Sequence, residues 1–211
     1  ALAIAAHELE GRPSATMRCI GLTGTNGKTS TVGILRSVLA AAGLSGGSLG
    51  TTGIDWTEGG RAVHHDATHT TPEGPQLFGW LAKMRDAGVE AVAMELSSHA
   101  LAQGRAAGLQ LDVAAWTNLS RDHLDFHGDM QEYEDSKGLL LTEWLARWGK
   151  SGATAVLNAD DPIVLRHLGI HERTLTFSCV PGTAADIVVT EAPQFSIKGC
   201  HVPVRTPRGN F

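Results

Sequence analysis

The sequence predicts an α/β fold: a mostly parallel sheet of the P-loop type flanked by helices, with a small antiparallel β annex near the C-terminus. Two observations predict the sheet. Apolar runs typical of strands alternate with helical patterns as far as about residue 178, and the patterns at residues 29–42 and 73–87 each stop at a glycine. A third observation predicts the annex, because DIVVTEA and FSIKGCHVPVRT alternate from residue 184 onward.

Composition fits one large domain. The chain has 211 residues, of which 42% are hydrophobic and 18% charged, enough for a sizeable core. The net charge of −5 gives no support for a nucleic-acid partner. No apolar run approaches the roughly 18 residues of a membrane span. Three widely spaced cysteines fit neither a disulfide framework nor a zinc site, and no signal peptide is visible, so we expect a cytoplasmic monomer.

The elements follow in order. We expect strands at residues 18–22, 89–95, 112–117 and 154–158, and helices at residues 29–42, 73–87 and about 129–148. Residues 1–17 are interpreted as a linker or the remnant of a preceding domain. Residues 18–211 form the predicted domain, with the annex at 184–211. Open α/β sheets bind ligands at the carboxyl ends of their strands, so the loops after the strands are where we expect the site.

The first such loop is TGTNGKTS, residues 23–30, between a strand and a helix. A helix N-terminus has unpaired N–H groups and attracts anions. Gly24 and Gly27 allow the backbone to approach a phosphate closely, Lys28 can reach phosphate oxygens, and Thr29 can hold Mg²⁺. Leu22 stands where the strict G-x-x-x-x-G-K-[ST] pattern has its first glycine. The order of strand, loop and helix nevertheless favours nucleotide binding over a surface turn.

The strand ending in Glu95 is followed by LSSHALAQGR. A carboxylate at that strand end can hold Mg²⁺ together with Thr29. The alternative is a solvated Glu95 beside a helix capped by Ser97 or Ser98. Further polar groups, Ser97, Gln103 and Arg105, could bind an anionic substrate, although each alone is typical of a surface.

The strand at 112–117 is followed by NLSRDHLDFHG. Asp122, His123, Asp125 and His127 lie within six residues there, and such groups can ligate a metal or exchange protons. Capping and local hydrogen bonds are the alternative. The pattern favours function for His123 more than for His127.

We expect HHDATHTTPEGP to be a loop, and it carries His64, His65 and His69 without the spacing of a zinc site. Its TTPE is typical of a helix start, with a hydroxyl cap and proline at the first helical position. Substrate contact by Thr70 and Thr71 is the alternative.

Lys137 lies on an apolar helical stripe with steps of three and four, formed by Tyr133, Leu140, Leu141, Trp144 and Trp148. A lysine there either extends past the core edge or is held inside for a purpose. A buried lysine would have a lowered pKa, and its neutral amine can react with CO₂.

Together these segments resemble the central ATP-binding domain of the Mur ligases. The matching motifs are TGTNGKTS, TTPE, MELSSHALAQGR, TNLSRDHLDFHG, YEDSK and VLNADDP, in the order of the family from about residue 20 to 162. The family's phosphate loop also lacks the first glycine. Family members carry a uridine-binding domain before this region and an amino-acid-binding domain after it, and both are expected to be missing here.

The resemblance implies roles for these residues. ATP would be held by Gly24, Thr25, Asn26, Gly27, Lys28, Thr29 and Ser30. Two Mg²⁺ ions would be held by Thr29, Glu95, His123 and a carbamylated Lys137. UDP-N-acetylmuramoyl-dipeptide would contact Thr70, Thr71, Ser97, Gln103 and Arg105, while His69 stands where some members have asparagine. The expected catalytic residues are Lys28, Lys137 and His123.

The implied reaction is ATP-dependent amide formation, which adds the third amino acid to UDP-N-acetylmuramoyl-L-Ala-D-Glu through an acyl phosphate. The partners would be that dipeptide and a free amino acid, either lysine or diaminopimelate. Alternatives are a ligase with the same core, such as folylpolyglutamate or cyanophycin synthetase, and a non-catalytic ATP-binding module. TTPE and SSHALAQGR favour the muramyl substrate.

Overall fold

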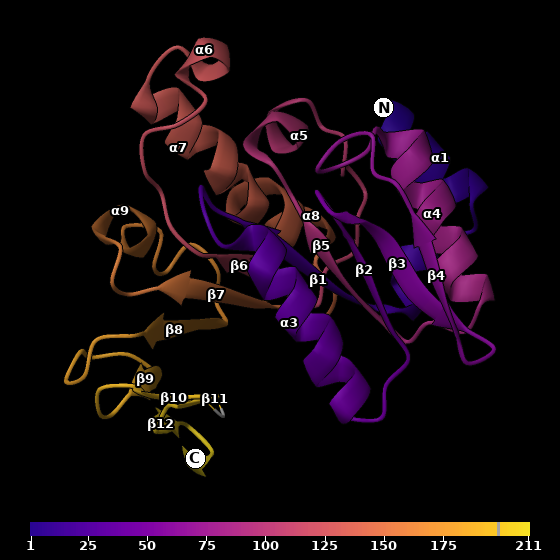
Figure 1. Ribbon diagram of the computed structural model, residues 1–211. Helices are drawn as coiled ribbons and strands as arrows, with labels where there is room; N and C mark the ends of the chain where they lie inside the picture. The colour runs from indigo at the N-terminus through magenta and orange to yellow at the C-terminus, as the bar shows by residue number, and fades with distance from the viewer. Residues whose placement is uncertain (198) are drawn as a thin grey trace.

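One sheet of eleven strands organises the computed structural model, which describes residues 1–197 and 199–211 (Figure 1). The strand order is β13-β12-β9-β8-β7-β6-β1-β5-β2-β3-β4, and every pairing from β9 to β2 is parallel. The strands are β1 (Arg18–Thr23), β2 (Gly46–Gly50), β3 (Gly53–Glu58), β4 (Arg61–His65), β5 (Ala91–Glu95), β6 (Val113–Trp116), β7 (Thr154–Asn158), β8 (Thr174–Ser178), β9 (Ile187–Val189), β12 (Val204–Thr206) and β13 (Gly209–Asn210).

The four strands predicted from the sequence are β1, β5, β6 and β7, and their bounds are confirmed to within two residues. The prediction omitted β2, β3, β4 and β8. In β2 the sequence GGSLG is typical of a turn, yet the strand lies between β5 and β3. Packing explains its glycines, because a Cβ on Gly50 would collide with the Glu95 carboxylate. His64 and His65, assigned to a loop, belong to β4.

Helices cover both faces of the sheet. One face carries the main core under α4 (Gly74–Asp86) and α7 (Met130–Leu139). On the other face, α3 (Lys28–Ala41) packs Val32 against Leu22 and Ala93. The shorter helices are α1 (Leu2–Leu9), α2 (Pro13–Thr16), α5 (Ser98–Ala102), α6 (Leu124–His127), α8 (Ala146–Trp148) and α9 (Pro162–Leu165).

The helix predicted at about 129–148 comprises three consecutive pieces. It starts as α7, where the Asp129 side chain accepts from Glu132 N, widens to the π-helix η1 (Leu140–Leu145), and ends as α8. The apolar stripe is confirmed, since its members from Tyr133 to Trp144 are at least 93% buried. Lys137 is one of them, so it is held inside.

The antiparallel annex is confirmed, with one addition. β12 pairs antiparallel with both β9 and β13, but β9 itself continues the parallel sheet beside β8. A separate antiparallel hairpin is formed by β10 (Gln194–Ser196) and β11 (Gly199–His201). Residue 198 in the FSIKGC segment lies outside the described residues.

The segment 1–17, predicted to be a linker or remnant, packs on the main core as α1 and α2. Ala3 and Ala6 of α1 are buried, and α1 lies against α4. The His7 ring contacts Phe78 with ring centroids 4.6 Å apart and bonds the Ser14 hydroxyl at 2.8 Å. Across the described ranges, no helix is both long and apolar enough to cross a membrane.

Substituting two glycines of α4 should change the free energy of unfolding in opposite directions. A Cβ on Gly74 would lie 2.6 Å from the Ala3 Cβ, whereas one on Gly79 would meet only Glu10 Oε1 at 3.9 Å. We expect Gly74→Ala to lower the free energy of unfolding by about 1–3 kcal/mol, because α1 must shift. Gly79→Ala should raise it by up to about 1 kcal/mol through helix propensity. Urea denaturation of the chain measures both, and stabilisation by Gly74→Ala would contradict the close contact of α1 with α4.

Candidate active site

The sequence-predicted polar segments meet at the carboxyl ends of β1, β5 and β6. β1 is central, with β5 on one side and β6 on the other. The chain leaves β1 toward the β2 edge, returns at β5 and then crosses to β6. This reversal is a topological switch point, where open α/β sheets bind their ligands.

The loop after β1 has the geometry of an anion site. Gly27, the N-cap of α3, has a φ of 85°, and Gly24 has a φ of 146°. A Cβ on Gly24 would collide with the Thr117 hydroxyl, so only glycine fits there. The loop leads directly into the N-terminus of α3, whose N–H groups and dipole favour phosphate. The predicted strand, loop and helix are therefore all present.

Residues after β6 hold this loop in place. Asn118 accepts from Asn26 N through its Oδ1 at 2.9 Å and donates to Asn26 O through its Nδ2 at 3.0 Å. The Thr117 hydroxyl also donates to Asn26 O, at 2.8 Å, and Thr25 N donates to Asn118 O at 3.0 Å. Thr117 and Asn118 were not singled out from the sequence. Their only signal was their place in TNLSRDHLDFHG at a strand end.

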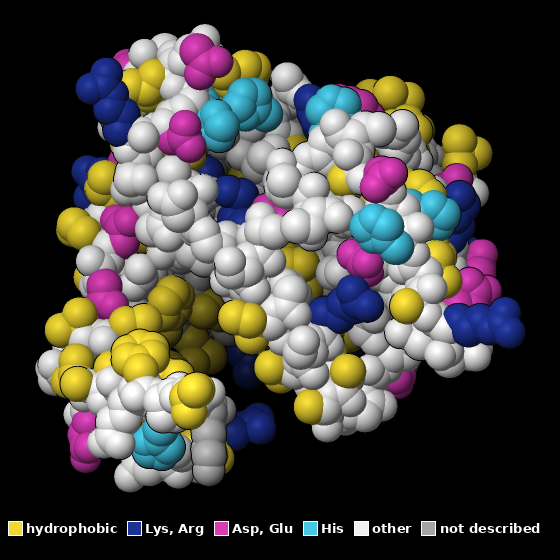
Figure 2. All heavy atoms as spheres, viewed as in Figure 1, with side chains coloured by type: hydrophobic (Ala, Val, Ile, Leu, Met, Phe, Trp, Pro, Cys, Tyr) yellow, Lys and Arg dark blue, Asp and Glu magenta, His cyan; other side chains and the backbone are white. Residues whose placement is uncertain are grey.

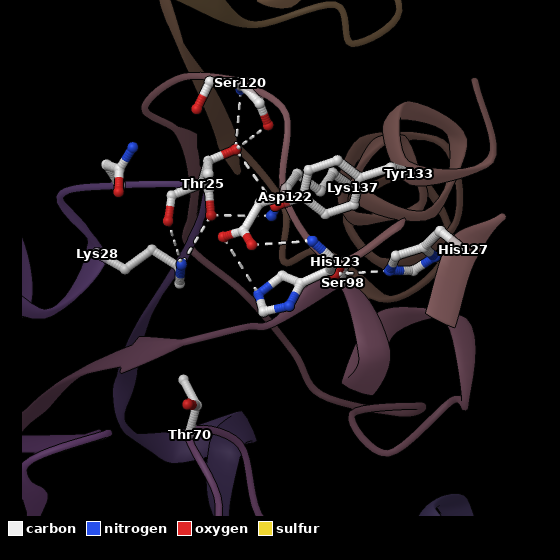
Figure 3. A network of polar contacts seen from close by, with 12 residues as sticks. Thr25, Lys28, Thr70, Ser98, Ser120, Asp122, His123, His127, Tyr133 and Lys137 are labelled. Atoms are coloured by element: carbon white, nitrogen blue, oxygen red, sulfur yellow. Dashed lines mark hydrogen bonds and ion pairs between the residues drawn. The ribbon is translucent and has the colours of Figure 1, made fainter. Parts of the chain in front are cut away.

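Two lysines converge on one carbonyl of the loop (Figure 3). Lys28 Nζ donates to Gly24 O at 2.7 Å and to Thr25 O at 3.0 Å, and Lys137 Nζ donates to Gly24 O at 2.8 Å. Lys137 is 1% exposed. Burial, together with the charge of Lys28, lowers the pKa of Lys137 to about 7, and burial lowers the pKa of Lys28 as well. Both side-chain nitrogens therefore lie at the loop where an anion is expected to bind.

Glu95 is a buried carboxylate at the end of β5, 1% exposed. Its Oε1 accepts from Thr51 N at 2.9 Å and its Oε2 from the Thr51 hydroxyl at 3.3 Å. The solvated alternative is therefore wrong. Ser97 is the cap of α5, since its hydroxyl accepts from Ala100 N at 3.2 Å. Thr51 was missed, because it sits in a glycine-rich turn that the sequence pattern did not connect to Glu95.

Thr71 ties the predicted substrate segment to β5. Its hydroxyl donates to Glu95 O at 2.8 Å and accepts from Ser97 N at 3.0 Å. Arg105 donates to Thr71 O at 3.1 Å, to Gln103 Oε1 at 2.7 Å and to Glu73 Oε1 at 2.9 Å.

A helix does start directly after TTPE, but the predicted hydroxyl cap and the predicted proline at the first helical position are wrong. α4 begins at Gly74 with Glu73 as N-cap and no side-chain cap bond. The threonine hydroxyls are not caps, because Thr71 bonds to the end of β5 and the Thr70 hydroxyl bonds the Thr51 hydroxyl at 3.0 Å.

These residues surround a cavity of about 440 Å³ beside the phosphate loop. Of the five predicted substrate residues, all but Gln103 line it, and Gln103 braces Arg105. The other lining residues are Thr51, Ala67, Thr68, His69, His99 and His123. A larger surface hollow, about 620 Å³, lies beside α3 and β2, away from Glu95 and Lys137. We assign the site to the smaller cavity because Thr51, which bonds the buried Glu95 carboxylate, lines it.

The histidines differ in role. His123 is the N-cap of α6 in the left-handed region, with a φ of 51° and a 47% exposed side chain. Asp122 fixes it, since His123 N donates to Asp122 Oδ1 at 2.9 Å and the ring Nε2 lies 3.6 Å from Asp122 Oδ2. His127 is buried between Ser98 and Ser136, which bond its two ring nitrogens at 2.9 and 3.2 Å. In the view of Figure 2, histidine side chains gather between α5 and α6.

The donor chemistry fits Mg²⁺ shared with a phosphate. Glu95 and the Thr29 hydroxyl are oxygen donors, which Mg²⁺ prefers, and the family resemblance adds His123. Within residues 1–197 and 199–211, no group of three or more His, Cys, Asp or Glu side chains could enclose a metal ion. Mg²⁺ is commonly bound through one or two carboxylates together with phosphate oxygens, without an all-protein cage.

Comparisons with known proteins show the family of this chain. Residues 22–203 match the Mur ligase middle domain. A UDP-N-acetylmuramyl-tripeptide synthetase of Deinococcus radiodurans is 40% identical over 215 aligned residues, covering 100% of this chain and 41% of that protein. A UDP-N-acetylmuramoyl-L-alanyl-D-glutamate–2,6-diaminopimelate ligase of Geobacillus kaustophilus is 46% identical, covering 77% of this chain and 33% of its own length.

Solved structures extend the likeness to the whole chain. A UDP-N-acetylmuramoyl-L-alanyl-D-glutamate–2,6-diaminopimelate ligase superposes with a TM-score of 0.78 at 26% identity, covering 100% of this chain and 43% of that one. A folylpolyglutamate synthase of Mycobacterium tuberculosis, complexed with ADP, shares the fold with a TM-score of 0.73 at 17% identity. It is covered over 52% of its length.

The chain spans about a third to two fifths of the length of these ligase relatives. The match to the Mur ligase middle domain covers most residues of this chain, including the phosphate loop, Glu95 and Lys137. The chain therefore belongs to the Mur ligase family, as a middle domain.

Proposed function

We propose that this chain is the ATP-binding part of a ligase that adds the third amino acid to UDP-N-acetylmuramoyl-L-Ala-D-Glu. The observation that carries the proposal is the meeting of a phosphate loop, two lysines of lowered pKa and a buried carboxylate beside a polar cavity. The names of its relatives, at 40–49% identity, supply the substrate. They favour diaminopimelate as the added residue.

The phosphate loop would provide the nucleotide-binding half of the proposed reaction. Its N–H groups and Lys28 would hold the β- and γ-phosphates of ATP, with Gly24 and Gly27 leaving room for them. Glu95 and Thr29 would hold one Mg²⁺, and His123 would assist with a second. Mg²⁺, when bound, neutralises charge on the phosphate oxygens. Lys28 stabilises the negative charge that develops during phosphoryl transfer.

The substrate half would lie in the cavity. Arg105 and the hydroxyls of Thr70, Thr71 and Ser97 suit an acidic dipeptide, because Arg pairs with carboxylates and hydroxyls orient them. The terminal carboxylate of the dipeptide attacks the γ-phosphate of ATP, giving an acyl phosphate and ADP. The amino group of the incoming amino acid then attacks the acyl carbon. Phosphate leaves, the amine loses a proton, and an amide remains.

The direct test supplies the full-length protein with Mg·ATP, UDP-N-acetylmuramoyl-L-Ala-D-Glu and either meso-diaminopimelate or L-lysine. We expect ADP release that depends on the dipeptide, and a product whose mass has increased by one amino-acid residue. Folate serves as the control substrate, because the folylpolyglutamate synthases share this fold. ADP release stimulated by folate but not by the muramyl dipeptide would favour that alternative ligase.

Substitutions of Lys28 and of Glu95 should lower the ligase rate for different reasons. Lys28→Ala removes charge stabilisation of the phosphates, and we expect a loss of about 100-fold or more in kcat. Glu95→Gln keeps the side chain's size and an acceptor for Thr51 while weakening the metal site, so excess Mg²⁺ should restore part of its rate. Titrations of ligase rate against Mg²⁺ measure this. An equal response of both variants would argue against separate roles.

Lys137 is a candidate for carbamylation within this proposal. Its pKa of about 7 leaves a large part of the amine neutral at neutral pH. A neutral amine adds to CO₂, forming an N–C bond and releasing one proton, which turns a cation into an anion. The carbamate would lie beside the phosphate loop, where it could hold or orient Mg²⁺. This explains why a lysine occupies a position of the apolar stripe.

Removing this side chain should therefore cost activity that a small anion can restore. We expect Lys137→Ala to lose at least about 100-fold in rate, with partial rescue by acetate or formate. Lys137→Arg should stay inactive, because a guanidinium remains protonated. In ¹³C-bicarbonate, a carbamate carbon signal should be present in the parent protein and absent from Lys137→Ala. The exposed Lys83 provides the control, since Lys83→Ala should keep both signal and rate. Absence of the carbamate signal from active parent protein would exclude the modification.

A further inference from the structure

Tyr133, the single tyrosine of the chain, lies fully buried between the phosphate loop and the histidines of α6. Its hydroxyl is 3.2 Å from Thr25 Oγ1, and its ring faces Lys137 Nζ at 4.5 Å from the centroid (Figure 3). Rings of His123 and His127 lie at 6.0 and 5.1 Å, centroid to centroid. One side chain thus touches the phosphate loop, the buried lysine and the histidine cluster.

The direction of the Thr25 hydrogen bond can be assigned. Thr25 Oγ1 accepts from Ser120 N at 3.0 Å and lies 3.2 Å from Ser120 O, to which it donates. A hydroxyl has one donor and two acceptor positions, so the remaining contact must be one in which Tyr133 donates. Burial raises the pKa of Tyr133, which keeps this proton on the phenol. The phenol thereby completes the bonding of a phosphate-loop side chain.

The Tyr133 ring face covers the side-chain nitrogen of Lys137, at 4.5 Å from the ring centroid, and holds it in place by packing. In the unmodified, protonated lysine the ring's electrons also attract the ammonium, more strongly because water is excluded. Tyr133 and Lys137 are 0% and 1% exposed and one helical turn apart on α7. The ring therefore packs against the lysine nitrogen, and Gly24 O accepts the hydrogen bond of that nitrogen at 2.8 Å.

We infer that Tyr133 is a positioning residue that couples the phosphate loop to Lys137: its hydroxyl fixes Thr25 and its ring fixes the Lys137 amine. The inference rests on the proposed function for its effect on rate. Its effect on nucleotide binding depends only on the phosphate loop. The two parts of the side chain can be removed separately, so they make separate predictions.

Binding is measured first, on this chain. Because there is one tyrosine, ¹³C-ring labelling gives the signal of Tyr133 alone. We expect Mg·AMPPNP to shift that signal, saturating with the calorimetric isotherm. Tyr133→Phe should weaken the nucleotide about 3- to 10-fold, the effect of one hydrogen bond. Thr25→Val should weaken it too, and adding Tyr133→Phe to Thr25→Val should cost nothing more, since the bond is already lost. Additive losses would overturn the link through the hydroxyl.

Rate is measured next, in the full-length ligase. Tyr133→Phe keeps the ring and should raise the KM for ATP while leaving kcat within about threefold. Tyr133→Leu also removes the ring, and should lower kcat at least tenfold further. Phe78→Leu is the matched control, because Phe78 is a buried aromatic residue of α4 whose substitution should lower thermal stability without changing KM or kcat. If Tyr133→Leu behaved like Phe78→Leu, the ring would have only a packing role. A parent protein that binds Mg·AMPPNP but makes no amide would refute the proposed function and leave the binding result standing.

Discussion

The close approach of the phosphate loop to the end of β6 is the contact on which the site depends. Gly24 has no room for a Cβ beside Thr117, and Asn26 is bonded by both Thr117 and Asn118. The loop is thereby fixed before any ligand arrives, which lowers the entropic cost of binding. It also fixes the direction of the Gly24 carbonyl, on which Lys28 and Lys137 converge.

The buried charges beside this loop oppose stability and favour binding. Glu95 and Lys137 are each 1% exposed, and removing a charge from water costs several kcal/mol unless it is well bonded. Glu95 is compensated by two groups of Thr51, and Lys137 by one carbonyl and one ring. Lys137 responds with a pKa lowered to about 7. While Lys137 is unmodified and protonated, an arriving anion would relieve the repulsion between the two lysines, so part of this cost would be recovered on binding.

The features that could be predicted from the sequence are those that local patterns encode. The P-loop glycines, four central strands and the stripe holding Lys137 all follow from spacing along the chain. Sequence reasoning missed β2, because GGSLG lacks the residues that favour strands and is specified by its neighbours, Glu95 among them. It also missed Thr51, Asn118 and Tyr133 as individual site residues. Each acts through a partner between 44 and 108 positions away in sequence, and no local pattern encodes such a pairing.

The end of β5 joins the two halves of the site. The Glu95 carboxylate is oriented by Thr51, whereas its backbone carbonyl receives the Thr71 hydroxyl. Thr71 in turn accepts from Ser97 N, and its carbonyl receives Arg105. The residues on the nucleotide side and the residues of the cavity are thus held by the same rigid strand end, and not by two independent loops. The proposed reaction between a phosphate and a carboxylate would need their separation fixed to within a fraction of an ångström. A strand buried between β1 and β2 provides that fixed separation better than any loop could.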